Sequence, residues 1–389
     1  MTRDALGRPP GEQGDASGGP VRSFDDWVRS HADFAALLVV ALGFAARLLT
    51  ARRSFVISDE SLHLQLASPT NVFGVYRASL SNAHPPLFVL LLHFWHRIVG
   101  PGWQLSLLSV AFGTAFLWVA YRWADSLFGK GPALVTVVLL SFLQPFVILS
   151  AEVRGYSLLL LLIAAALAAL ERGLKKASPS WLVVFAGLTV LASLTHYAAL
   201  RFAATALVYA GVRLRGERSS RRLVTAYAFG LVAVTGVALL LYATHLSTLR
   251  GGMLEREAET TWLRTSYFNA GEVGALAFLA RQTVSFFLFL FSSRAPSIAA
   301  AILFAAGIAF LARKRPATAV LLALPFVIAA AGGLLRLYPY GGSRHSIDLG
   351  LFACAGIAVA AGRLAGNRIW LVFAVLALLL APAALSLGW

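Results

Sequence analysis

The strongest constraint on the fold is a series of apolar stretches, each close to the length that crosses a lipid bilayer. A transmembrane helix needs about 20 mostly apolar residues. The 389-residue chain is 59% hydrophobic and 13% charged, against roughly 45–50% and 25% in soluble domains, which excludes a single water-soluble core. We expect an all-α integral membrane protein, with candidate spans at residues 34–50, 104–122, 133–151, 156–171, 181–196, 198–212, 223–243, 296–312, 317–335, 346–362 and 369–386.

Two further apolar stretches, 85–99 and 273–291, contain histidines or an arginine and are ambiguous. Short loops rich in Lys and Arg lie in the cytoplasm. If both ambiguous stretches lie along the outer interface as juxtamembrane helices, every short basic loop falls on one side, including those with Lys175, Arg218 and Lys314. We therefore predict about eleven spans, a cytoplasmic N-terminus, and outer loops at residues 51–103 and 244–295.

The remaining composition narrows the class of protein. Residues 1–33 are rich in Gly, Pro and Asp and are predicted to form a cytoplasmic, largely disordered tail, followed by a multi-pass domain over 34–389 in the cell membrane. The net charge of +16 does not indicate nucleic acid, because the basic residues lie in short clusters between apolar spans. The sequence has no Walker or GxGxxG phosphate loop. Seven of the eight histidines fall at or near the predicted outer face, where we expect the chemistry.

The first candidate motif, Ser58-Asp59-Glu60, follows the first span. Two adjacent carboxylates could be an ordinary helix start capped by Ser58. Few other carboxylates are predicted at the outer face, which favours a functional role. His63 would share a helical face with Asp59, so a hydrogen-bonded or metal site is an option.

The second motif, His84-Pro85-Pro86-Leu87, opens the stretch 85–99. Prolines fit the first turn of a helix, so a plain helix start explains them but does not explain the histidine.

The third motif runs from Glu152 through Arg154 to Tyr156 in a very short outer turn. A mutual ion pair between Glu152 and Arg154 is one reading. The other is that Glu152 shares a polar site with Asp59 while Arg154 binds an anionic headgroup, since arginine is suited to bidentate contacts with phosphate.

The fourth motif is the outer turn 336–348, which includes Tyr340, Arg344 and His345. Anchoring at the membrane interface accounts for the tyrosines but not for Arg344-His345. His196-Tyr197, at the outer end of the fifth span, is either an interfacial pair or part of the same site.

Taken in order, these residues resemble the polytopic glycosyltransferases of the GT-C fold, and within them glycosyltransferase family 39. That family includes polyprenyl- and dolichyl-phosphate-mannose protein mannosyltransferases and the aminoarabinose transferase of lipid A. Its pattern is an outer Asp-Glu pair, then His-Pro-Pro-Leu, an acidic-x-Arg-x-Tyr turn and a late Arg-Tyr. The counterparts are Asp59-Glu60, His84 to Leu87, Glu152 to Tyr156 and Arg344-His345, where histidine replaces the usual tyrosine.

The resemblance implies transfer of a sugar from a polyprenyl-phosphate donor to an acceptor hydroxyl at the outer face, in one inverting displacement. Asp59 would be the base, with Glu60 and Glu152 also catalytic. The donor phosphate and its lipid carrier would contact Arg154, Arg344, His345, His84 and Tyr156. His63, His196, Tyr197 and Tyr340 would complete the substrate pocket, and a divalent cation (Mg or Mn) could bind Asp59 and Glu152. Expected partners are the donor, membrane lipids and a glycan, lipid or protein acceptor, with no nucleic acid.

Three other readings stay open at the level of the sequence. A transporter or lipid flippase would show internal repeats, broken helices and midplane charges. A lipid-linked glycan polymerase or ligase would share the carrier and the sidedness. A membrane scaffold would explain the spans but not the clustered histidines, arginines and carboxylates.

Overall fold

The computed structural model describes residues 30–54, 58–216, 220–249, 252, 260–364, 366 and 369–386, and no strand occurs among them. Residues 1–29 of the predicted tail lie outside this description. The predicted all-α class is confirmed. The longer helices are α2 (Ala32–Arg53), α3 (Ser58–Ala67), α4 (Val72–Ser79), α5 (Leu87–Val99), α6 (Leu107–Phe128), α7 (Lys130–Phe142), α8 (Gln144–Ala151), α9 (Tyr156–Lys175), α10 (Pro179–Ser193), α11 (Ala198–Gly216), α12 (Arg221–Leu241), α15 (Ala275–Phe291), α16 (Arg294–Lys314), α17 (Pro316–Leu334), α18 (Ile347–Leu364) and α19 (Ile369–Ser386).

Ten of the eleven predicted spans each coincide with one of these helices, and the span predicted at 133–151 is the bent pair α7 and α8. The count of eleven membrane crossings is not confirmed. Among the described residues, seven helices are long and apolar enough to cross a membrane, and a bent pair, α7 with α8, would make eight. Helix α10 has only 15 residues, and α11 carries three arginines. The ambiguous stretches form α5 and α15, of 13 and 17 residues.

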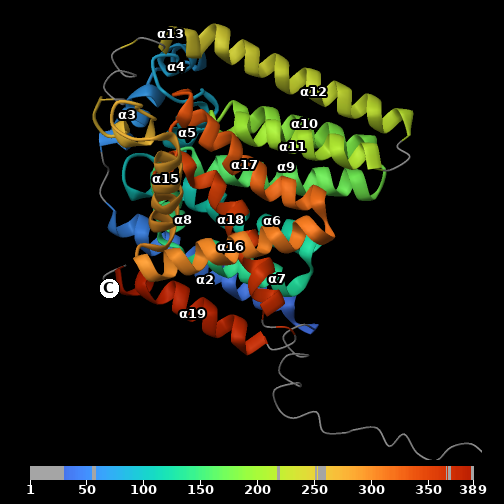
Figure 1. The fold of residues 1–389 in the computed structure, drawn as a ribbon. Coiled ribbons are helices and arrows are strands. Elements are labelled where there is room, and N and C mark those ends of the chain that lie inside the picture. Colours follow the sequence, from blue (N-terminus) through green and yellow to red (C-terminus); the bar gives the residue numbers. More distant parts are fainter. Residues whose placement is uncertain are drawn as a thin grey trace, which may run out of the picture.

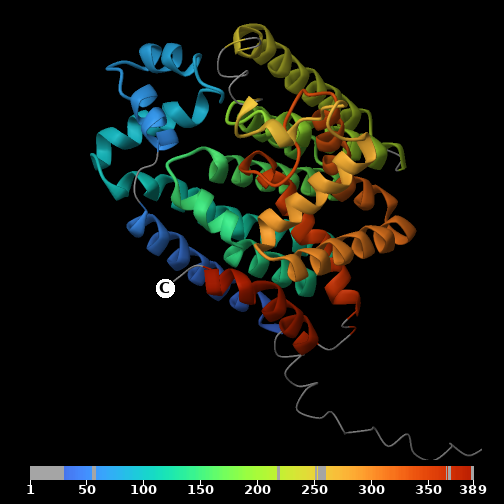
Figure 2. The same ribbon diagram turned by 60° about the vertical axis from the view of Figure 1, so that its left-hand side comes forward.

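The long helices lie side by side in one bundle (Figure 1). Helices α9 and α18 form its centre, since 78% and 83% of their apolar segments are buried, against 22% for α2. The short helices α3, α4 and α5 gather at one end, as the turned view also shows (Figure 2). Helix α15 lies across the direction of the bundle at that same end (Figure 1), as a helix along an interface would.

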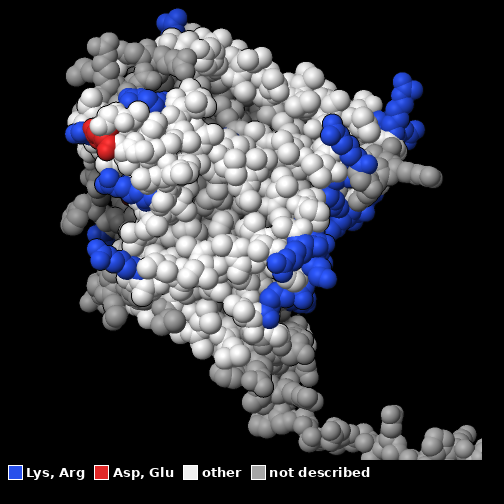
Figure 3. Space-filling view, in the orientation of Figure 1, with Lys and Arg blue, Asp and Glu red and all other residues white. Residues whose placement is uncertain are grey.

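Basic side chains mark the opposite end of the bundle. Lys and Arg occupy the last turns of α9, α11, α16 and α18. Figure 3 shows them gathered away from α15, whereas the acidic side chains in that view lie at the α15 end together with further basic ones. We refer to these two ends as the basic end and the α15 end.

Helix α8, which follows a bend after α7, leads into the third motif, Glu152 to Tyr156, at the α15 end. The two helices meet at 57° around Leu143 and Pro145. Because proline has no N–H, the carbonyl of Ser141 loses its helical partner. Arg47 of α2, fully buried, donates to the carbonyls of Leu140 and Ser141 at 2.9 and 3.1 Å and so satisfies the broken turn.

Candidate active site

Asp59 lies where three segments distant in sequence meet. It is in the first turn of α3, and its Oδ2 is 2.8 Å from Nη1 of Arg154 and 2.6 Å from Nη2 of Arg344. Arg154 is in the turn between α8 and α9, and Arg344 begins the short helix η4 (Arg344–Ser346) before α18. The side chain of Arg154 is 4% exposed, whereas that of Asp59 is 39% exposed. The carboxylate is therefore held by two guanidinium groups but stays open to a ligand.

The two arginines control the charge of Asp59. Burial of the carboxyl opposes its ionisation, but Arg154 and Arg344 outweigh that effect and hold the pKa of Asp59 below its ordinary value. Asp59 is therefore ionised at neutral pH. The predicted pairing of Arg154 with Glu152 alone is not what the structure shows, since Arg154 pairs with Asp59.

Glu60, next to Asp59 in the sequence, has a different environment. Its side chain is buried, and Oε1 accepts a hydrogen bond of 2.6 Å from the backbone N–H of Val153. This bond ties α3 to the turn that carries Arg154. Glu60 is thus placed to hold two parts of the site together.

Four histidines from four segments pack against one another beside Asp59. The rings of His84 and His196 stack at 4.7 Å, and the rings of His63 and His345 lie 5.9 and 6.5 Å from that of His84. Burial, reinforced by the neighbouring His196 and Arg154, holds the pKa of His84 well below its ordinary value. Among the described residues, neither Nδ1 of His84 nor Nε2 of His196 has a hydrogen-bond partner. Both rings line the cavity described next, and within the described part of the chain these two nitrogens are not committed to a protein partner.

A cavity of about 270 Å³ connects these groups. Eight of the residues singled out from the sequence line it, together with Tyr338, Trp262, Tyr267 and several leucines. Those eight are Asp59, His63, His84, Arg154, His196, Tyr197, Arg344 and His345. The four sequence motifs thus meet at one cavity, whose lining combines charged and histidine side chains with apolar ones.

Glu152 lines a second, larger cavity of about 510 Å³. Arg344, His345, Trp262 and Leu263 line both cavities and so form the partition between them. The second cavity also has apolar walls from α8 and α15. Burial raises the pKa of Glu152, an effect that the neighbouring Arg154 opposes.

The other tyrosines predicted for the site form contacts mainly within the protein. Tyr156 packs against His84 and His196 at ring distances of 6.1 and 5.2 Å. The Tyr197 hydroxyl donates to Nδ1 of His245 at 2.5 Å, although Tyr197 also lines the first cavity. Tyr340 is 2% exposed, hydrogen-bonds Thr283, and is not among the described residues that line either cavity. The structure therefore does not bring Tyr340 to the site.

A buried ion pair behind the site is not predicted from the sequence. Arg201 of α11 donates to both carboxylate oxygens of Asp348 at 3.2 and 2.5 Å, and to the carbonyl of His345 at 3.4 Å. Its guanidinium also lies 5.3 Å from the ring centre of Tyr338. An arginine within an apolar span is costly unless it is paired. That signal, in the stretch 198–212, could have revealed Arg201.

The predicted divalent cation has no good set of ligands in this arrangement. Within the described residues, no group of three or more His, Cys, Asp or Glu side chains could hold a metal ion. Two guanidinium groups occupy Oδ2 of Asp59, and Glu152 lines the other cavity. The cation stays a prediction, and no step below depends on it.

One family model matches the chain. Residues 83–247 match the model described as dolichyl-phosphate-mannose-protein mannosyltransferase. The matched segment contains His84, Glu152, Arg154 and His196, but not Asp59 or Arg344. No curated protein matches the sequence.

Solved structures share the fold over most of the chain. ArnT from Cupriavidus metallidurans, in a crystal structure with undecaprenyl phosphate bound, superposes with a TM-score of 0.55 at 17% identity, over 88% of this chain and 62% of ArnT. The oligosaccharyltransferase AglB from Archaeoglobus fulgidus, in complex with an inhibitory peptide and a dolichol-phosphate, gives 0.57 at 12% identity, over 92% of this chain and 55% of AglB.

These matches define the fold. The chain has the fold of the GT-C membrane glycosyltransferases, as the sequence predicts, and residues 83–247 match a mannosyltransferase family model. The chain spans about 50–60% of the length of the structures that it resembles. Its own donor, acceptor and reaction are therefore matters of proposal.

Proposed function

We propose that this protein transfers a sugar from a polyprenyl-phosphate donor to an acceptor hydroxyl at the outer face of the cell membrane. The observation that carries the proposal is the position of Asp59, which lies between Arg154 and Arg344 in the lining of a cavity at the α15 end. The basic end would face the cytoplasm, because short basic loops stay inside. The N-terminus would then be cytoplasmic.

The two arginines would bind the phosphate of the donor. Guanidinium groups make strong, bidentate hydrogen bonds to phosphate oxygens. As the bond between the anomeric carbon and the phosphate oxygen breaks, negative charge grows on the leaving phosphate, and cations already in place stabilise that charge. Arg154 is itself buried, so its interaction with the phosphate would be little screened by water.

Asp59 would act as the general base. Its carboxylate takes the proton of the acceptor hydroxyl while the acceptor oxygen attacks the anomeric carbon from the side opposite to the phosphate. One carbon–oxygen bond forms as the other breaks, so the configuration at the carbon inverts. No covalent intermediate with the enzyme is required.

Donor binding would also make Asp59 a better base. In the free protein both arginines hold its carboxylate, which lowers its basicity. A donor phosphate competes for the same guanidinium groups and weakens that hold. The pKa of Asp59 then rises toward the working pH, which favours proton transfer. The base is in this way activated only when the donor is present.

The histidine cluster and the second cavity would receive the sugar and the acceptor. His84 and His196 offer unpaired ring nitrogens to sugar hydroxyls. Glu152, in the second cavity across the partition, would orient the acceptor. The divalent cation of the sequence prediction would assist only if substrate binding rearranged Asp59 and Glu152.

The proposal is tested by sugar transfer in membranes that contain the full-length protein. Several radiolabelled polyprenyl-phosphate sugars are supplied, and label in lipid, glycan and protein fractions is measured. Positioned acid–base catalysis contributes roughly 10²–10⁴-fold, so Asp59→Asn should reduce turnover by about that factor while donor binding is largely kept.

Glu272→Gln is the matched control, since Glu272 is exposed and its side chain pairs with Arg264, outside both cavities. It should leave transfer unchanged. Near-normal transfer by Asp59→Asn would refute Asp59 as the base. Movement of intact donor across the membrane without transfer would support a flippase instead.

A further inference from the structure

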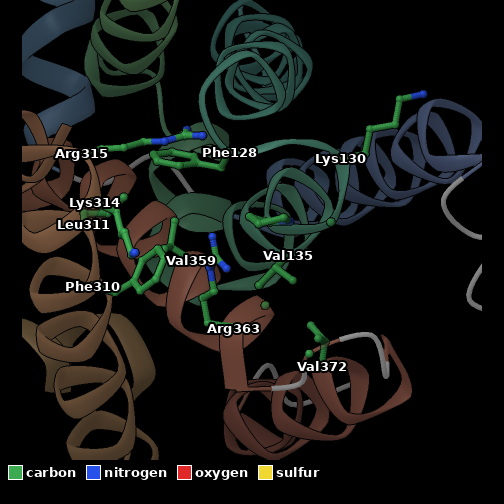
Figure 4. A pocket seen from close by; sticks show the side chains of 14 residues that line it. Phe128, Lys130, Val135, Phe310, Leu311, Lys314, Arg315, Val359, Arg363 and Val372 are labelled. Atoms are coloured by element: carbon green, nitrogen blue, oxygen red, sulfur yellow. The ribbon is translucent and has the colours of Figure 1, made fainter.

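A cavity of about 560 Å³ lies at the basic end, far from the candidate active site along the bundle. It lies between the ends of α7, α16, α18 and α19 (Figure 4). Four of its lining residues are basic, and no Asp or Glu occurs among the described residues that line it. The basic residues are Lys130, Lys314, Arg315 and Arg363, and the apolar walls include Phe310, Leu311, Val359 and Val372.

The four basic side chains differ in their contacts within the protein. Lys130 forms an ion pair with Asp33 at 3.2 Å, and Arg315 donates to the carbonyl of Leu127 at 2.6 Å. The Arg363 guanidinium lies 4.1 Å from the ring centre of Phe310 and has no ion pair among the described residues; neither has Lys314. Figure 4 shows Lys314 and Arg363 approaching the same space from α16 and α18, whereas the Lys130 amine points away.

Favourable interaction with helix ends explains part of this arrangement. Lys314 and Arg363 lie in the last turns of α16 and α18, where cations stabilise the helix dipole. That effect acts on each helix separately. It does not explain why two cations from different helices line one cavity without a carboxylate to balance them, since like charges repel.

We propose that this cavity binds the phosphate-bearing headgroup of an anionic phospholipid. Lys314 and Arg363 would hold the phosphate, and the apolar side chains beside them would contact the upper part of the acyl chains. Basic pockets between membrane helices on the cytoplasmic side bind such headgroups. The volume lies within the range of roughly 300–1,000 Å³ found for ligand pockets. The apolar walls favour a lipid over a soluble phosphate.

The test measures lipid retention by the purified full-length protein. The protein is extracted in detergent and incubated with phosphatidylglycerol, phosphatidylcholine or inorganic phosphate, and bound species are counted by native mass spectrometry. We expect phosphatidylglycerol to bind at least about tenfold more tightly than phosphatidylcholine. The double variant Lys314→Gln/Arg363→Gln should lose that preference.

Arg313→Gln is the control, because Arg313 precedes Lys314 on α16 but is not among the lining residues. It should retain the preference. Lys314→Glu, at an exposed position, provides a second variant that should lose the preference without disturbing packing. Equal binding of both lipids, unchanged preference in the Lys314 variants, or binding of inorganic phosphate that excludes phosphatidylglycerol would each overturn the proposal. Sugar transfer is not part of the readout, so the result is independent of the proposed reaction.

Discussion

At the scale of single residues, the environment of Asp59 differs from that of an ordinary general base. A base works best when its pKa is near the working pH, yet Arg154 and Arg344 lower the pKa of Asp59. The pKa of Asp59 would rise if the donor phosphate bound the two arginines before the proton is transferred. The same two side chains then serve both the leaving group and the base, in sequence.

This coupling predicts a difference between two pH profiles. On the proposed mechanism Asp59 must be ionised to act as the base, so activity falls as the pH drops through its pKa. The profile of kcat/KM reports the free enzyme, where that pKa is below the ordinary value of about 3.9 for Asp. The profile of kcat reports the donor-bound enzyme, and we expect its acid limb at higher pH. Identical acid limbs in both profiles would argue against release of Asp59 by the donor.

The sequence could predict much of the site at this scale, but not all of it. The sequence points to Asp59 because few carboxylates are predicted at the outer face, to Arg154 because arginine is suited to phosphate, and to Arg344 because interfacial anchoring does not explain it. The structure brings the three within ion-pair distance. The bond from Val153 to Glu60 depends on how α3 docks, which no local pattern records. A tyrosine in a turn gives no sign of the side on which it packs, so the sequence does not predict that Tyr340 bonds to Thr283 instead of lining the cavity.

At the scale of elements, the ion pair between Arg201 and Asp348 fixes α11 against α18 directly behind η4. Because Arg201 also bonds the carbonyl of His345, it sets the position of the segment that carries Arg344. Arg201 is in this sense a positioning residue. It contacts the backbone of the site without lining the cavity.

Removal of either partner should therefore have two separable effects. Arg201→Met leaves Asp348 buried and unpaired, which costs about 3–5 kcal/mol of stability. The double variant Arg201→Met/Asp348→Leu should recover most of that stability, because a buried ion pair can be replaced by apolar residues. Donor affinity should stay weakened in both variants, since the bond to His345 is gone.

Thermal unfolding and donor binding, measured on the same samples, check this. Recovery of donor affinity together with stability in the double variant would show that Arg201 has no positioning role.

The positions of the helices are easier to predict from the sequence than the number of membrane crossings. Every predicted span is helical because apolar stretches of this length must satisfy their own backbone hydrogen bonds in lipid. The number of crossings is harder to predict, since α10 is short and α11 contains Arg201, whose charge is paired with Asp348 of α18. Hydropathy along the chain cannot anticipate partners supplied by another helix.

At the scale of the whole molecule, the separation of charge along the bundle predicts its orientation. In a background where buried Cys354 is replaced by serine, Lys314→Cys marks the basic end and Glu272→Cys marks the α15 end. A membrane-impermeant thiol reagent should label position 272 in intact cells. It should label position 314 only after the membrane is opened, and labelling of 314 from outside would reverse the orientation.

The arginine that caps the broken turn between α7 and α8 also has a consequence for biogenesis. Arg47 enters the membrane with α2, while Leu140 and Ser141, whose carbonyls it binds, follow 93 and 94 residues later. An arginine at the centre of a lipid-facing helix costs roughly 2.5–3.5 kcal/mol during insertion, and less toward its ends. Until α7 has been synthesised, that cost is not relieved. We therefore expect α2 to gain its full stability in the membrane only after α7 has been synthesised.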